Sequence, residues 1–191
     1  METELSRARN KEKEKTILSA AVRIVAADGV GASIARITKE AEISVGSLYA
    51  YFASKDALLN ALYLSLKAEV AEALLAECPV SGSAKERGRY LWNQYIFWAL
   101  ANPEKQQAMQ QLSVSSHIKT AAIKADDGLR GMTPTLQSCL PKRSAMPPEF
   151  ALGLMQALID LVLSFIRSEP EHIDTYANIG FHAFWHAISA R

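Results

Sequence analysis

Residues 33–52 constrain the fold of this 191-residue chain more than any other segment. They read SIARITKEAEISVGSLYAYF, which places two short amphipathic helices and a tight turn next to one another. Apolar side chains at helical spacing on both sides of the turn give a common inner face: Ile37, Ala41, Ile43, Leu48 and Phe52. Two helices joined in this way form a helix-turn-helix, whose second helix enters the major groove of DNA. We therefore expect this segment to bind DNA.

The second helix of the motif keeps its polar and small side chains on the outer face. Val45, Gly46, Ser47 and Tyr49 lie near its N-terminal end, where a recognition helix meets base edges. Gly46 allows a close backbone approach, Ser47 can exchange a hydrogen bond with a base, and Val45 can pack on a thymine methyl. The tyrosines and Lys55 can hold phosphates. Spacing alone leaves open the alternative that this is only a short packed helix.

The remaining sequence is helical in its periodicity, with no sustained strand-like alternation, so we expect an all-α protein. No apolar run reaches the roughly 18 uncharged residues of a membrane span, so we expect no membrane partner. Two cysteines, Cys78 and Cys139, give no disulfide framework, and KEKEK stands where a signal peptide would be apolar. A cytoplasmic protein is the expectation. The net charge of +1 means that attraction to DNA must come from local placement of charge.

Glycine, proline and serine mark the expected helix ends. Gly29 ends the first helix, Ser33, Ser44 and Ser54 cap the next three, and Pro103 begins a later one. The expected helices, in addition to the two short ones in residues 33–52, cover residues 11–27, 54–76, 85–102, 103 onward, 147–168 and 170–190. Residues 124–146 give no clear pattern. We place a helix-turn-helix domain at residues 1–53 and a ligand-binding and dimerisation domain at residues 54–191.

The stretch TILSAAVRIVAADGVGASIARITKEAEISVGSLYAYFASKDAL resembles the DNA-binding domain of TetR-family transcriptional regulators, and GSLYAYFASKDAL is its most specific part. The resemblance implies a three-helix DNA-binding head on an all-helical body that binds a small-molecule effector. It also implies a homodimer on an inverted-repeat operator. By position, it assigns base contacts to Val45, Gly46 and Ser47, and mainly phosphate contacts to Tyr49, Tyr51, Lys55 and Ser33.

Two residues depart from the pattern of that family. Glu42 stands where the turn usually has glycine, which predicts a strained or shifted turn at a cost near 1 kcal/mol. Thr38 stands where alanine is usual, at the closest approach of the two helices.

The body, through RYLWNQYIFWALANPEKQQAMQQLSVS and YANIGFHAFWHAI, is similar to the RamR-type subgroup of multidrug-responsive repressors. That similarity implies a pocket for flat, often cationic aromatic compounds. By position it points to Tyr63, Lys67 and Trp92, with Met155 where relatives have phenylalanine. Ile96 or Tyr95 lies one turn from Trp92, and Asp126 or Asp127 can supply a counter-charge. From the residues alone, the alternative is that the aromatic helix of residues 89–100 is simply packed in the core.

The last two helices are the expected homodimer interface. Residues 150–166 carry a polar stripe of Gln156, Asp160 and Ser164 on an apolar helix, which we expect to pack with the last helix against a symmetry mate. His182 and His186 are four apart, a spacing that can bind zinc but is more often found at surfaces. We expect no metal.

The charged N-terminal tract and the absence of catalytic motifs also bear on function. Arg7, Arg9 and Lys11 belong to a charged helix start, and alternatively reach the DNA backbone or minor groove. No phosphate loop or nucleophile motif indicates an enzyme or a cofactor. The sequence therefore predicts a ligand-responsive repressor released by a small hydrophobic or cationic aromatic compound. The alternative is an activator, or a regulator without a drug-like ligand.

Overall fold

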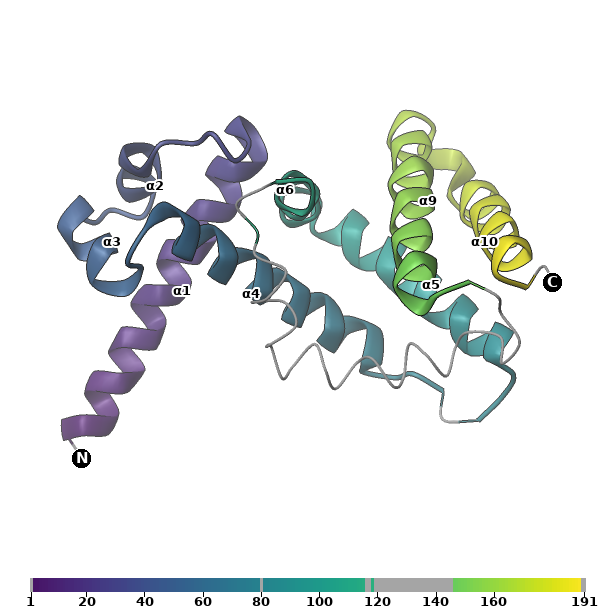
Figure 1. Ribbon diagram of the computed structural model, residues 1–191, viewed down its shortest axis with the longest axis horizontal. Coiled ribbons are helices and arrows are strands. Elements are labelled where there is room, and N and C mark those ends of the chain that lie inside the picture. The colour runs from purple at the N-terminus through teal and green to yellow at the C-terminus, as the bar shows by residue number, and fades with distance from the viewer. Residues whose placement is uncertain (1, 80, 116–117, 119–145, 190–191) are drawn as a thin grey trace. The chain divides into compact units, whose positions relative to one another are not determined.

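The computed structural model describes residues 2–79, 81–115, 118 and 146–189. These residues form helices and no strand, as Figure 1 shows, which confirms the expected all-α class. They fall into two compact units, residues 1–68 with 102–126 and residues 69–101 with 127–191. None of the helices described is long and apolar enough to cross a membrane.

The first unit contains the predicted head. Its helices are α1 (Glu2–Asp28), α2 (Ile34–Glu40), α3 (Val45–Tyr51), the first part of α4 (Lys55–Leu75) and α6 (Pro103–Ser113). The apolar stripe of α1 is buried throughout: Ile17, Ala20, Ala21, Ile24 and Val25. α6 packs along α1, and its Met109 and Leu112 are buried. The helix-turn-helix thus belongs to a unit whose helices α1 and α6 share a buried apolar core.

The predicted caps of the head are confirmed. Gly29 has a φ of +73°, and its amide donates to the Val25 carbonyl at 2.9 Å, which ends α1. The Ser44 hydroxyl accepts from the Ser47 amide, and the Ser54 hydroxyl from the Ala57 amide, each at 3.1 Å. These bonds satisfy amides at helix starts that have no partner within their own helix.

The second unit contains the end of α4, α5 (Ala84–Ala101), α9 (Pro148–Ser168), a 3₁₀ turn η1 (Pro170–His172) and α10 (Ile173–Ser189). α9 begins and ends as predicted. The last helix was expected to begin at Pro170, but Pro170 opens the 3₁₀ turn and α10 starts at Ile173. Glu169, between α9 and this turn, has a φ of −137° and so does not continue the α-helix.

Three helices of the second unit meet at Gly180. A methyl group added there would lie 2.8 Å from Cζ2 of Trp92 and would collide with Val162 on α9. The Trp92 ring stacks on Phe184 and meets Phe181 edge-on, with ring centroids 5.9 and 6.0 Å apart. Glycine is therefore what lets α5, α9 and α10 approach this closely.

α5 starts with a reciprocal capping box. The Ser83 hydroxyl accepts from the Glu86 amide at 3.2 Å, and the Ser83 amide donates to the Glu86 carboxylate at 2.7 Å. The backbone and hydroxyl donors of Ser83 stabilise the charged carboxylate and lower the pKa of Glu86 below its ordinary value.

The expected head, residues 1–53, lies wholly within the first unit. α4 then runs from this unit into the second, so the functional boundary that we placed at residue 53 stays a prediction. Asp126, Asp127 and Cys139 lie outside the described residues. Cys78 is half-buried.

Candidate nucleic-acid interface

α3 has one buried side and one open side. Leu48 is fully buried, and Phe52, which follows the helix, is 5% exposed. On the other side Gly46 and Ser47 are exposed, and Val45 and Tyr49 are 44% and 46% exposed. The structure therefore brings the three residues predicted to contact bases, and Tyr49, predicted mainly to contact phosphate, onto one accessible helix surface.

Packing within the protein does not require glycine at position 46. A methyl group added to Gly46 would meet only the Ser44 hydroxyl, at 3.9 Å, which is an ordinary contact. The neighbouring Ser47 hydroxyl is 2.9 Å from that of Ser44 and is open to solvent on its outer side. Glycine at position 46 therefore has no role in the packing of the head and suits a close external partner.

The turn between α2 and α3 confirms the expectation for Glu42. Among the described residues Glu42 is the only non-glycine residue with a positive φ, 55°. Its amide donates to the Lys39 carbonyl at 3.2 Å, and the Ile43 amide donates to the Thr38 carbonyl at 3.0 Å. These two bonds are those of a Schellman motif, in which the left-handed position normally holds glycine. The turn has therefore kept its usual geometry, with a strained residue in it.

Thr38, the other departure from the family pattern, is buried with 3% exposure between the helices. Its hydroxyl donates to the Ala35 carbonyl one turn earlier at 3.1 Å. Because the polar atom is satisfied within its own helix, burial carries no large penalty.

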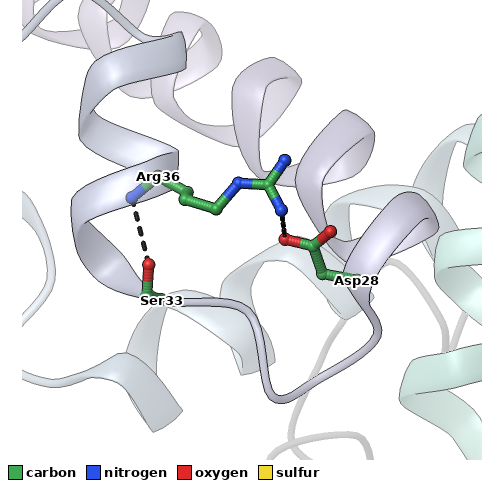
Figure 2. A network of polar contacts seen from close by, with 3 residues as sticks. All are labelled: Asp28, Ser33 and Arg36. Carbon is green, nitrogen blue, oxygen red and sulfur yellow. Dashed lines mark hydrogen bonds and ion pairs between the residues drawn. The ribbon is translucent and has the colours of Figure 1, made fainter.

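Two ion pairs fasten α2 to α1, and sequence reasoning did not find them. Figure 2 shows Arg36 held at both ends: its amide donates to the Ser33 hydroxyl at 3.3 Å, and its guanidinium pairs with Asp28. Arg23 on α1 pairs with Glu40 on α2 at 2.6 Å. The partners are 8 and 17 residues apart, so no helical spacing in the sequence indicates them.

The residues predicted to hold phosphates lie around α3. Tyr51, at the end of α3, is half-buried, and its hydroxyl donates to Oδ1 of Asn10 on α1 at 3.4 Å. Lys55 is the first residue of α4 and is half-buried, and Ser33 is exposed as the cap of α2. All seven predicted DNA residues are thus in the first unit, and their contacts with DNA stay a prediction.

The residues predicted to bind the effector fall into two groups. Tyr63 and Lys67 are one turn apart on α4 in the first unit, with the Lys67 ammonium 5.5 Å from the Tyr63 ring centroid. Burial raises the pKa of the Tyr63 hydroxyl. Trp92, Ile96 and Met155 are in the second unit.

Within the second unit, Trp92 is a core residue. Its side chain is fully buried, and Nε1 donates to the Ala177 carbonyl of α10 at 3.0 Å. Ile96 is buried as well, while Met155 is half-buried on α9. This arrangement is the packed-core alternative for Trp92, and a ligand contact at these three positions stays a prediction.

The polar stripe on α9 makes hydrogen bonds within the chain, and the expected homodimer interface of this helix stays a prediction. The Gln156 amide donates to the Tyr95 hydroxyl of α5 at 3.1 Å and to the Asp160 carboxylate at 3.2 Å. Ser164 is exposed and donates to the Leu161 carbonyl at 2.7 Å. Gln156 therefore satisfies its polar atoms within one chain, and no symmetry mate is needed for it.

The histidine pair on α10 gains no further metal ligands in the described part of the chain, where no group of three or more suitable side chains occurs. Nε2 of His182 lies 3.3 Å from the Arg89 guanidinium, which itself lies over the Phe181 ring. A permanent cation at this distance opposes the binding of another cation.

Comparison with known proteins supports the interpretation of the head. Residues 17–62 match the family model for bacterial regulatory proteins of the tetR family. The HTH-type transcriptional regulator YuxN of Bacillus subtilis is 48% identical over 50 residues, which cover 26% of this chain and 17% of that protein. The matched segment thus spans less than a fifth of the curated relative.

Solved structures extend the likeness to the whole chain. A tetR family transcription regulator from Shewanella sp. PV-4 has a TM-score of 0.82 at 26% identity, covering 94% of this chain and 99% of that one. A TetR family regulator from Marinobacter aquaeolei VT8 has a TM-score of 0.75 at 24% identity, covering 95% and 98%. Residues 17–62 of this chain thus match the tetR family model, and the chain is similar in fold to these solved regulators over most of its length.

Proposed function

We propose that this TetR-family chain is a transcriptional repressor that binds an inverted-repeat operator as a homodimer and is released by a small-molecule effector. The observation that supports DNA binding most directly is the open side of α3. There Val45, Gly46, Ser47 and Tyr49 face outward from a helix that is anchored by Leu48 and held in place by the turn at Glu42. That arrangement suits insertion of α3 into a major groove.

Alanine substitution of the outward residues tests this proposal. The DNA is a duplex selected from random sequence by the full-length protein. Ser47→Ala and Tyr49→Ala should each weaken binding to it by about tenfold or more, because the first loses a predicted base contact and the second a predicted phosphate contact. Ser65→Ala, an exposed serine on α4, is the matched control and should bind like the wild type. Operator affinities that are unchanged in both α3 variants would show that α3 does not read DNA.

The homodimer is proposed through α9 and α10. Both helices carry large apolar side chains that their own unit leaves open: Leu161, Phe165 and Ile179 are 52%, 47% and 61% exposed. A monomer rarely leaves such side chains clustered without a partner. In a two-fold dimer, the two α3 helices would meet half-sites about 34 to 36 Å apart, one turn of DNA.

The effector is proposed to be a flat, often cationic aromatic compound, and Tyr63 and Lys67 of the first unit and Trp92, Ile96 and Met155 of the second are each predicted to affect its binding. Ligand binding would favour a dimer with wrongly spaced heads, which needs a coupling of about 2 kcal/mol. Crystal violet is a suitable probe: it should quench tryptophan fluorescence and release the duplex. Met155→Phe should bind it more tightly, since a rigid ring replaces a flexible thioether. Absence of quenching and release together would exclude this ligand class.

Whether the protein represses or activates transcription is tested separately. Deleting the gene should raise transcription from the promoter that the protein occupies if it is a repressor. A fall in transcription would instead identify an activator, the alternative that the sequence left open.

A further inference from the structure

We infer that residues 8–16 of α1, here named the extension, form a second DNA-contacting surface that binds phosphates beside the groove occupied by α3. This inference rests on the proposed function, because it presupposes that α3 binds DNA. It concerns a different helix, however, and a part of that helix that packs no side chain into the core of the head.

The extension is a helix that contributes nothing to the core. Among the side chains of α1 that the structure describes, which start at residue 8, the first buried one is Ile17, and every one from residue 8 to residue 16 is exposed. A helix rises about 1.5 Å per residue, so the extension adds roughly 13 Å of helix to the buried part. Figure 1 shows that the N-terminal part of α1, which includes the extension, projects past α2 and α3. Packing within the head does not explain why the helix continues so far.

The extension is tied to the proposed recognition helix. The Tyr51 hydroxyl, at the end of α3, donates to the Asn10 side chain near the start of the extension at 3.4 Å. This bond joins residues 41 positions apart. The extension therefore lies beside the end of α3, and DNA that α3 binds would have its backbone near the same helix.

The cations of the extension are available, whereas two others in the head are not. Arg23 and Arg36 are neutralised by Glu40 and Asp28. The extension holds Arg9, Lys11, Lys13 and Lys15, all exposed, and within the described residues none of these four is in an ion pair. Since the chain has a net charge of only +1, such local groups are where phosphate attraction must arise.

Helical spacing assigns the contact to one side of the extension. Lys13 follows Asn10 by three residues and Arg9 by four, so Arg9 and Lys13 form a stripe beside the face that meets α3. Lys11 and Lys15 lie on the opposite side of the helix. Glu14 follows Asn10 by four residues and Glu12 follows Arg9 by three, so a carboxylate flanks the Arg9–Lys13 stripe on each side, and the four cations of the extension outnumber its two acidic residues.

The test is the salt dependence of DNA binding by the full-length protein. The variant Arg9→Gln with Lys13→Gln removes two cations per head, and four per dimer, without changing an internal contact. Each lost phosphate contact lowers the slope of log affinity against log salt by about 0.9, so the slope should fall by roughly 3 to 4. Affinity for the selected duplex and for a scrambled duplex should fall by the same factor, because phosphate contacts are not sequence-specific.

The matched control is Lys11→Gln with Lys15→Gln, which removes the same charge from the opposite side of the same helix. Its slope should change much less than that of the Arg9 and Lys13 variant. Equal slopes in the two double variants, or a wild-type slope in the Arg9 and Lys13 variant, would overturn the inference. An acidic protein as the true partner of the extension would give that second result.

Failure of this inference differs from failure of the proposed function. Ser47→Ala should lower the affinity for the selected duplex more than for the scrambled one, and should leave the slope close to that of the wild type. If the extension makes no contact, Ser47→Ala still reduces specificity. If α3 does not read DNA, no duplex is enriched from random sequence.

Discussion

Glu42 is the residue at which local backbone preference and the fold of the head disagree. Its φ of 55° is unfavourable for any residue with a Cβ atom, yet both hydrogen bonds of the Schellman motif are formed around it. The inner faces of α2 and α3 fix the position of the turn, since Ile37 and Leu48 are fully buried. The buried apolar contacts therefore outweigh the strain at Glu42.

Replacing Glu42 by glycine should relieve this strain. We expect Glu42→Gly to raise the free energy of unfolding by about 1 kcal/mol, the usual cost of a left-handed conformation less the entropy that glycine adds to the unfolded chain. Urea unfolding followed by circular dichroism would measure the change. Glu42→Ala is the matched control and should give no such gain, because alanine keeps the Cβ atom. Equal stabilisation in both variants would mean that the carboxylate, and not the backbone, is the source of the cost.

At the residue scale, the sequence predicted the groups whose role depends on near neighbours. Gly29, Ser33, Ser44 and Ser54 end or cap helices as expected, because each acts within a few positions of itself. The ion pair of Arg23 with Glu40 was not predictable in this way. It depends on how α1 and α2 cross, and tertiary packing decides that angle.

At the scale of the element, α5 shows how a helix start can depend on pH. The lowered pKa of Glu86 means that its charged form is the one stabilised in the folded state. The contribution is therefore complete above the ordinary pKa of 4.5 and is lost as the pH falls through the lower folded-state value. The carboxylate and Ser83 thus hold the first turn of α5 together at neutral pH.

The expected effect of Glu86→Gln on stability follows from the direction of this pKa shift. The wild type should unfold at a higher temperature than the variant near pH 7, and the difference should shrink as the pH is lowered to about 3. Thermal unfolding at several pH values measures it, and only the difference between the two proteins is compared. A difference that stays constant over this range would contradict the role of the charge.

Elements were predicted well where apolar periodicity and helix ends agreed. α9 met both conditions, with proline at its start and a stripe of buried residues. α1 was predicted to start near Lys11 but begins at Glu2. Its first turns have no apolar stripe to reveal them, although Glu, Arg and Lys favour helix. The open side of α3 was predicted from spacing, whereas the contacts of Trp92 depend on α10, which no local pattern reveals.

At the scale of the whole molecule, dimerisation is the property on which DNA binding should depend. A single head has little net charge, so two heads on one operator would supply affinity that one lacks. Ile179→Asp puts a charge on the exposed apolar surface of α10 and should convert the dimer to a monomer, as light scattering would show. The affinity for the operator should fall when the dimer is lost.

The control for that variant is Phe97→Asp. Phe97 on α5 is 60% exposed, almost the same as Ile179, and lies outside the proposed interface. This variant should remain dimeric and bind the operator. A dimer that survives Ile179→Asp would place the interface elsewhere.

The open side of α3 has a consequence for how such a protein can diverge. Val45, Gly46, Ser47 and Tyr49 bury little, while Leu48 and the Ser44 cap hold the helix in place. Substitutions at the four outer positions should therefore cost the fold almost nothing. A duplicated gene could acquire a new target sequence through these positions alone, with the remaining chain unchanged and without passing through an unstable intermediate.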